Sequence, residues 1–281
     1  MKKAFIKVMA LAIISTLVLA VSGCKETKDG SVIQTADFKI TYTVGTETNS
    51  IDSKLTLYET FAPKTTERVI SLINDGYYND TVLTLSKQQG YVVVGGYTEG
   101  YNVKNYTGSA LEGEFTQGGL KSELTVQPGA LVMLRDFDID SGDAKYGTAK
   151  ANFAIVLTND VPFTADEFCV FGFIDSESLT ALQKALVDNS KGDGYLHMRY
   201  AGERVNGVVS SENSFDYYLN SDNEYYKLEG NEFVEMEFAN EDDADYAKKE
   251  IIDDSDNLQD IFALPAVTFK VSASMKSGCN K

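Results

Sequence analysis

Several chemically useful side chains are scarce in this sequence, which contains no tryptophan, one histidine and three cysteines among 281 residues. With His197 as the sole imidazole, neither a metal site built from several histidines nor a Ser-His-Asp triad with a choice of base can form. The chain therefore indicates no metal and no cofactor. Cys169 and Cys279 could form one disulfide, but a buried small side chain and an exposed thiol in the tail are the simpler interpretation.

Basic residues are also scarce, since 25 Lys and Arg face 42 Asp and Glu and leave a formal net charge of −17. Removing Lys2, Lys3 and Lys7 with a signal peptide would take the side-chain charge to −20. Such acidity disfavours nucleic acid as a partner, because the phosphate backbone carries the same sign of charge. It equally disfavours lying on anionic lipid, so attachment to a membrane would need an anchor.

No apolar run reaches the roughly 20 residues that a membrane-spanning helix needs. The run over 8–21 is about 14 residues long, follows a basic start, and predicts a secretory signal peptide over 1–23. It ends in Val-Ser-Gly-Cys, which resembles the lipobox of bacterial lipoproteins, where the cysteine is lipidated and becomes the mature N-terminus. The resemblance implies an acylated Cys24, a lipidated flexible linker over 24–35, and an extracytoplasmic protein anchored by lipid to the bacterial cell membrane.

The rest of the chain is dominated by strand patterns. Alternation of apolar and polar residues predicts two antiparallel strands over 37–44 and 54–58. A helix is predicted over 63–75, with Pro63 at its start and Gly76 after its end, and a second one over 177–189. Further strands, which are short and separated by glycine-rich or polar loops, are predicted over 81–85, 91–94, 130–134, 153–157, 168–173 and 266–271. The predicted fold class is mainly β, a closed antiparallel β-barrel capped by two helices.

Residues 192–262 differ in composition, being strongly acidic and rich in tyrosine, and we interpret them as an inserted α+β lobe before the last strand. The domain then spans 36–274 around this insertion, and 275–281 form a C-terminal tail. Within the lobe, 225–236 is typical of a hairpin and 241–252 of the start of a helix. Four tyrosines could form a recognition surface or pack between hairpin and barrel, and these are Tyr217, Tyr218, Tyr225 and Tyr226.

Six short words of sequence occur in the order and spacing of one known family. The words at 62–67 and 76–81, Ala-Pro-Lys-Thr-Thr-Glu and Gly-Tyr-Tyr-Asn-Asp-Thr, resemble the first helix and following turn of the cyclophilin-type peptidyl-prolyl cis-trans isomerases. Gly-Tyr-Val-Val-Val-Gly-Gly, Gly-Glu-Phe, Pro-Gly-Ala-Leu-Val-Met and Val-Phe-Gly follow at 90–96, 113–115, 128–133 and 170–172. The resemblance covers about 38–189 and 265–271, and the lobe has no counterpart.

This resemblance implies catalysis of rotation about Xaa-Pro peptide bonds, whose barrier of about 18–20 kcal/mol arises from amide resonance. In active members an arginine donates toward the prolyl nitrogen and weakens that resonance. Here its position falls on Leu85 or Ser86, depending on where one extra residue is placed, so the catalytic arginine is not evident. Lys87 is adjacent, but a point charge does not reproduce a planar guanidinium. Arg135 is the nearest arginine elsewhere.

The resemblance also implies a peptide groove, in which several polar side chains have been replaced. The family's glutamine before Gly-Gly is Val94, and its pocket histidine maps to Phe168. Losing a single preorganised donor lowers a rate on the order of 100-fold to 1000-fold, so efficient catalysis is not expected. The groove residues expected from the resemblance are Tyr91, Val92, Val94, Leu134, Asn152, Phe153, Phe163 and Phe168.

Two functions therefore remain open. The first is a tethered prolyl isomerase with weak activity, acting on or binding Xaa-Pro segments of exported proteins. The alternative is a catalytically inactive cyclophilin-like module that binds proteins at the cell surface. An isomerisation assay on a tetrapeptide separates them.

Overall fold

The computed structural model describes most of the chain, namely residues 25–26, 32–86, 88, 90–115, 123–136, 144–189, 194–202, 204–205, 208–236 and 260–276. Several sequence predictions lie outside these residues: the signal peptide over 1–23, Cys24, Lys87, the helix expected over 241–252, and Cys279.

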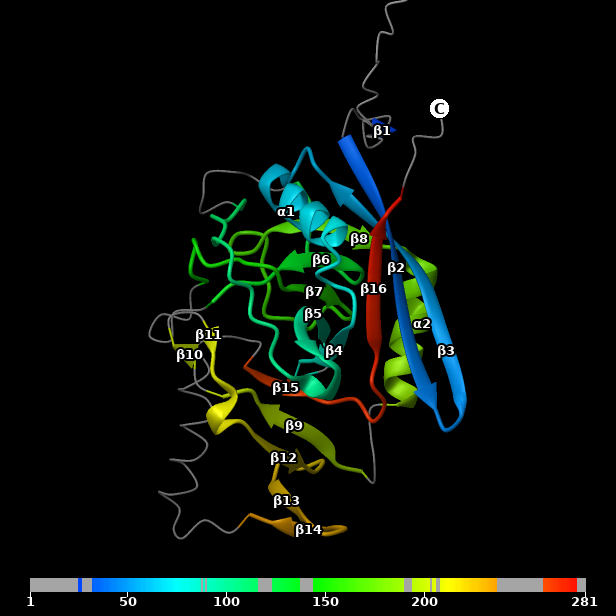
Figure 1. Cartoon of the computed structure of the whole chain (residues 1–281), viewed down its shortest axis with the longest axis vertical. Helices are drawn as coiled ribbons and strands as arrows, with labels where there is room; N and C mark the ends of the chain where they lie inside the picture. Colours follow the sequence, from blue (N-terminus) through cyan, green and yellow to red (C-terminus); the bar gives the residue numbers. More distant parts are fainter. Residues whose placement is uncertain are drawn as a thin grey trace, which may run out of the picture.

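A closed barrel of eight antiparallel strands forms the centre of the molecule, as predicted (Figure 1). Its strands are β2 (Val32–Val44), β3 (Glu47–Tyr58), β4 (Thr81–Leu85), β5 (Tyr91–Thr98), β6 (Ala130–Met133), β7 (Phe153–Val156), β8 (Val170–Ile174) and β16 (Lys270–Met275). Around the barrel they pair in the order β2, β3, β8, β6, β7, β5, β4 and β16. Because β16 pairs with both β4 and β2, the sheet closes on itself.

Two boundaries differ from the sequence prediction. β2 begins at Val32, inside the segment expected to be a linker, because Ile33 to Thr35 already pair with β3. A short strand before it, β1 (Lys25–Glu26), pairs with Ile33 and Val32. The last strand covers 270–275 rather than 266–271. Within it, side chains alternate between solvent and core, and Val271 and Ala273 are buried against the barrel interior.

Two helices flank the barrel where the sequence predicts them. Helix α1 (Pro63–Asn74) begins at a proline, whose fixed φ suits the first turn, and ends before Gly76, which has a φ of +69°. Helix α2 (Ser176–Asp188) is capped by Asp175, whose carboxylate accepts a hydrogen bond from the backbone N–H of Ser178. Neither helix is long and apolar enough to cross a membrane.

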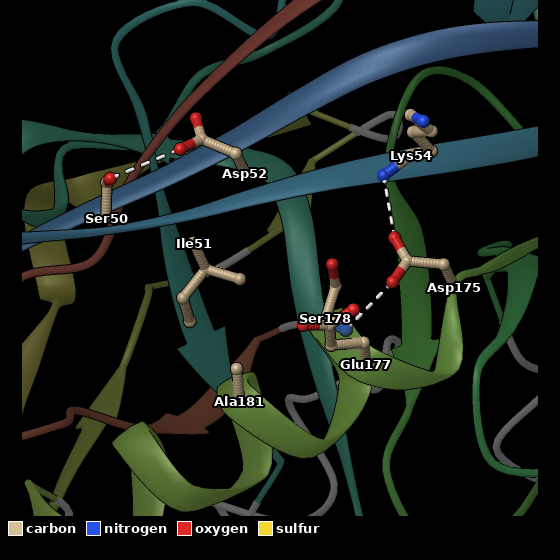
Figure 2. Close-up of a pocket in the computed structure, with 8 residues that line it drawn as sticks. All are labelled: Ser50, Ile51, Asp52, Lys54, Asp175, Glu177, Ser178 and Ala181. Atoms are coloured by element: carbon tan, nitrogen blue, oxygen red, sulfur yellow. Dashed lines mark hydrogen bonds between the residues drawn. The ribbon is translucent and has the colours of Figure 1, made fainter.

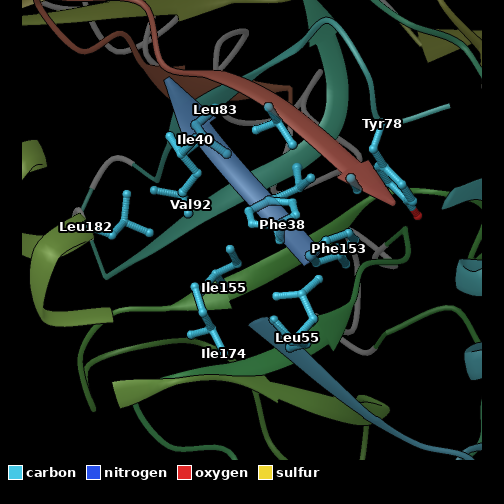
Figure 3. Packing of buried hydrophobic residues seen from close by; sticks show 14 of the residues in the cluster. Phe38, Ile40, Leu55, Tyr78, Leu83, Val92, Phe153, Ile155, Ile174 and Leu182 are labelled. Carbon is cyan, nitrogen blue, oxygen red and sulfur yellow. The ribbon is translucent and has the colours of Figure 1, made fainter. Parts of the chain in front are cut away.

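The barrel interior is filled by large apolar side chains from both of its walls (Figure 3). Phe38 and Ile40 of β2 project toward Phe153 and Ile155 of β7 across the interior. Leu182 of α2 belongs to the same buried cluster. The barrel is therefore a packed core with no channel along its axis among the described residues.

The inserted lobe continues the barrel sheet through β4. Two residues of β4 pair with β16, but Leu85 at its end pairs with Ala263. From there the sheet runs through β15 (Ile261–Ala263), β9 (Leu196–Tyr200), β12 (Phe215–Leu219), β13 (Tyr225–Glu229) and β14 (Glu232–Glu235). Smaller elements are η1 (Glu99–Tyr101), β10 (Arg204–Val205), β11 (Val208–Val209) and η3 (Ser211–Asn213). The hairpin expected over 225–236 is β13 and β14.

In Figure 1 the lobe strands extend to the end of the molecule opposite β1, with β14 outermost. The first described residues of the chain and the lobe thus lie at opposite ends of its longest axis.

Candidate functional site

The end of β4 holds both positions to which the expected arginine could map, and neither faces an open surface. Leu85 lies opposite Val92 of β5, is 2% exposed and belongs to the barrel interior. The Ser86 hydroxyl accepts hydrogen bonds from the backbone N–H groups of Gly90 at 2.9 Å and Tyr91 at 3.3 Å, and so closes the turn into β5. No cation stands at either position.

Arg135 does not supply the missing guanidinium at a surface cavity. It is 2% exposed, its Nη1 donates to the backbone carbonyl of Tyr146 at 2.7 Å, and its guanidinium carbon lies 4.2 Å from the ring centre of Phe115. Burial lowers the pKa of Arg135 to about 10. The side chain therefore supports the segment that contains Tyr146 from beneath, and is turned away from solvent.

The expected groove residues fall on two different faces of the barrel wall. Three of them point into the barrel interior, and these are Val92, Val94 and Phe153. Four others belong to a second cluster on the outer side of the same wall, and these are Tyr91, Leu134, Phe163 and Phe168. Asn152 is half-buried at the edge, next to the backbone of Gly95. A ligand on the outer face can touch only the second set.

The outer cluster is filled by its own aromatic rings. The Phe163 ring centre lies 4.8 Å from that of Tyr91 and 4.9 Å from that of Phe168. All three residues are at most 5% exposed, and Phe168 is fully buried. Burial raises the pKa of the Tyr91 hydroxyl far above its ordinary value. A proline ring could enter this region only by displacing Phe163 or Phe168.

Two surface hollows lie elsewhere and share no residue with the expected groove. One, of about 480 Å³, lies between β3 and the start of α2, where Asp175 accepts hydrogen bonds from the backbone N–H groups of Lys54 and Ser178 (Figure 2). The other, of about 510 Å³, lies over β2, β3 and β16. Of the acidic residues in the first hollow, Asp175 caps α2, so the role of its carboxylate is structural.

A family model described as cyclophilin type peptidyl-prolyl cis-trans isomerase/CLD matches residues 43–195, more than half of the chain. The chain belongs to this cyclophilin family. The match ends just before β9, so the strands of the lobe and β16 lie outside it.

Among solved structures, the chain is similar to a cyclophilin type peptidyl-prolyl cis-trans isomerase of Cryptosporidium parvum, with 20% identity over 57% of this chain and 87% of that chain, and a TM-score of 0.41. A structure of the same protein in the presence of the dipeptide Ala-Pro gives 22% identity over 56% and 87%, with a TM-score of 0.39. No curated protein sequence matches the chain.

One of the cyclophilin words in this chain has a structural role that the geometry explains. Both carboxylate oxygens of Glu114 accept backbone N–H groups at the start of α1, from Lys64 at 2.8 Å and Thr65 at 2.6 Å. Ala62, the residue before the helix, offers no side-chain cap, so Glu114 takes over that task from a distant segment. A Cβ at Gly113 would lie 1.8 Å from the Phe115 ring, which explains the glycine.

Sequence reasoning missed Val93 and Ala154, which lie on the outer face of this cyclophilin wall beside Tyr91. The signal was present, because alternate residues of a strand share a face. Tyr91 therefore belongs with Val93, and Val92 belongs with Val94 on the inner face. Cys169 is a free, fully buried thiol within 3.5 Å of the Thr65 hydroxyl, and burial raises its pKa to about 12.

Proposed function

We propose that this cyclophilin-family chain is a lipid-anchored extracytoplasmic protein that binds segments of exported proteins and isomerises their Xaa-Pro bonds at most slowly. The observation that carries this proposal is the filled outer face. The rings of Phe163 and Phe168 fill the region in which the resemblance implies a bound proline, and Leu85 and Ser86 stand at the positions to which it maps the arginine. Preorganised donors supply most of the rate in sites of this kind.

Family membership supports binding of proline-containing segments as the retained activity. The outer face keeps its apolar character, because its members are apolar or aromatic throughout. What is missing, at the positions to which the arginine maps, is a cationic donor that would stabilise the twisted amide more than the planar one, and only such differential stabilisation accelerates a reaction. A ligand held there would gain burial without gaining rate.

The isomerisation test uses the chain from Lys25, which keeps every residue that the structure describes. Turnover of a Xaa-Pro tetrapeptide is measured beside a family member that has the arginine. We expect a kcat/KM at least about 100-fold lower than that of the control, the effect of losing one preorganised donor. A rate within a few-fold of the control would refute the proposal. Loss of that rate in Lys87→Ala would then assign the donor to Lys87.

Peptide binding is measured on the same protein by NMR, following the ring signals of Tyr91 and Phe163 during titration with a proline-containing peptide. Shifts confined to these rings locate binding at the outer face of the barrel. Unchanged barrel signals together with shifts in lobe residues locate it at the lobe. Absence of any shift with peptides and with exported proteins contradicts a binding function.

The anchor is tested in the full-length chain expressed in bacteria. We expect the parent to incorporate a labelled fatty acid and to sediment with membranes. Cys24→Ala should lose both properties, while Cys279→Ala, the matched control, keeps them. Fatty-acid labelling that persists in Cys24→Ala would overturn the assignment of the lipidated cysteine.

A further inference from the structure

The lobe sheet has one face packed on the molecule and one face that carries aromatic rings toward solvent. Met198, Tyr217 and Leu219 lie on the packed face and are at most 2% exposed. Tyr218 and His197, which pair across β12 and β9, lie on the other face. Because side chains alternate along a strand, Tyr217 and Tyr225 lie on the packed face and Tyr218 and Tyr226 on the other face. The lobe tyrosines are therefore divided between packing and a candidate recognition surface.

Five rings on the outer face are joined in a continuous series, and we call this surface the lobe face: Tyr195, His197, Tyr218, Tyr226 and Phe233. The His197 ring stacks on Tyr218 with centres 4.5 Å apart, and Tyr218 meets Phe233 at 5.0 Å. Phe233 stacks on Tyr195 at 4.0 Å, and Tyr195 meets Tyr226 at 5.0 Å. Each ring is held by a neighbour, so little side-chain entropy is lost when a ligand binds.

Acidic side chains accompany these rings. Glu235 pairs with Tyr226 across β14 and β13, and the Tyr226 hydroxyl donates to the Glu224 carboxylate at 3.3 Å. Asp216 accepts hydrogen bonds from Arg199 and lies 3.1 Å from His197 Nε2. Residues 192–262 contain 19 Asp and Glu against 5 Lys and Arg, a net charge of −14 out of −17 for the whole chain.

This combination selects a cationic partner. Tyrosine faces attract ammonium and guanidinium groups through their ring quadrupoles, and nearby carboxylates add long-range attraction. An anionic membrane surface or a nucleic acid would be repelled. Residues 237–259 of the same chain, which lie outside the described residues, carry nine acidic and two basic residues, so their like charge disfavours them as the occupant.

The position of the lobe favours a protein partner. The lobe face lies on strands at the end of the molecule opposite β1 (Figure 1). Since β1 begins directly after Cys24, a lipid on that cysteine would leave the lobe pointing away from the bilayer. We propose that the lobe face docks lysine- and arginine-rich segments of exported proteins, with their cationic side chains over the tyrosine rings. This inference rests on the proposed function and names the chemistry of the bound segment.

The experiment measures binding of two labelled peptides, one of alternating Gly and Lys and one of alternating Gly and Glu, to the chain from Lys25 by fluorescence anisotropy. We expect the lysine peptide to bind, the glutamate peptide not to bind, and the affinity to fall as salt is added. Simultaneous Tyr195→Ala, Tyr218→Ala and Tyr226→Ala should weaken binding roughly 10-fold or more, at the usual worth of three exposed cation–π contacts.

Two matched controls make the result specific. Phe215→Ala removes an exposed ring from the opposite face of β12 and should leave the affinity unchanged. Replacing the same three tyrosines with phenylalanine keeps the ring faces and should retain the affinity within about 3-fold. If the alanine variant does not fold, NMR of the parent provides the test. The ring signals of the three tyrosines should then shift when the lysine peptide is added.

Equal affinity of the parent and the folded alanine variant would overturn the proposal, because the attraction would then be general acidity. Failure of the lysine peptide to bind the parent would also overturn the proposal. If the peptide binds only after residues 240–256 are deleted, that segment, and not an exported protein, is the ligand of the lobe face. Neither result bears on isomerisation. A fast tetrapeptide rate would contradict the proposed function of the barrel and leave lysine-peptide binding at the lobe unaffected.

Discussion

Placing an arginine at the end of β4 is the most direct test of the site description. Leu85→Arg restores the residue type that active cyclophilins have at one of the two mapped positions. In this chain the Leu85 side chain points into the barrel core, 2% exposed, with Val92 opposite on β5 and Ala263 opposite on β15. The new guanidinium would therefore lie among apolar side chains and not over a bound proline.

The size of the effect follows from that burial. An unpaired charge in a core costs about 3–5 kcal/mol, and the larger side chain adds about 1–3 kcal/mol of overpacking. The sum, about 4–8 kcal/mol, is comparable with the whole stability of an ordinary domain, which is about 5–15 kcal/mol. We expect Leu85→Arg to be partly or wholly unfolded and to show no isomerase activity.

Urea unfolding followed by circular dichroism measures the first effect, and tetrapeptide turnover measures the second. Leu85→Met, a swap of similar volume, is the control and should cost less than about 1.5 kcal/mol. A Leu85→Arg protein as stable as the parent and able to turn over the peptide would refute the reasoning. It would mean that the side chain at 85 reaches the outer surface and that the interior placement is wrong.

Three further outcomes concern charged side chains. Glu114→Gln should lower the free energy of unfolding by about 1–3 kcal/mol in urea, because the amide leaves one N–H at the start of α1 without an acceptor. Arg135→Met should leave the tetrapeptide rate unchanged and alter stability by less than about 2 kcal/mol, since relief of a buried cation offsets the lost hydrogen bond. Burial alone would raise the pKa of Asp216, but hydrogen bonds from Arg199 and His197 outweigh it and lower that pKa below 3.8. The stability that ionised Asp216 contributes is present above 3.8 and is lost as pH falls through the lowered value, so unfolding curves of the parent and Asp216→Asn should converge only there.

Much of the barrel could be predicted from sequence because its signals are local. Pro63 and Gly76 bound α1, and the apolar spacing of α2 defines its buried side. Short strands such as β6 and β7 are continuous apolar runs, which are typical of strands buried on both faces. These features depend on neighbouring residues only.

The division of the site between two faces was missed, although the alternation of strand side chains is a local signal for it. Val92 and Val94 were expected beside Tyr91, although strand alternation places them on the opposite side of the wall. The role of Glu114 could not be predicted at all, because it depends on contact with a helix start about 50 residues earlier in the sequence. The last strand was placed too early, since the small residues Ser272 and Ala273 give weak alternation.

The missing arginine and the filled outer face are parts of one physical change. A groove for proline must keep an apolar floor open to solvent, which is unfavourable unless polar side chains at its rim hold it open and hydrate it. At the position to which the resemblance maps the family's histidine, this chain has Phe168, whose ring packs on Phe163, and Phe163 packs in turn on Tyr91. Restoring a guanidinium alone therefore cannot restore efficient catalysis, because a proline would reach it only by displacing Phe163 or Phe168. Both the rim and the donor would have to be rebuilt together, and each change alone should leave the isomerisation rate where it is.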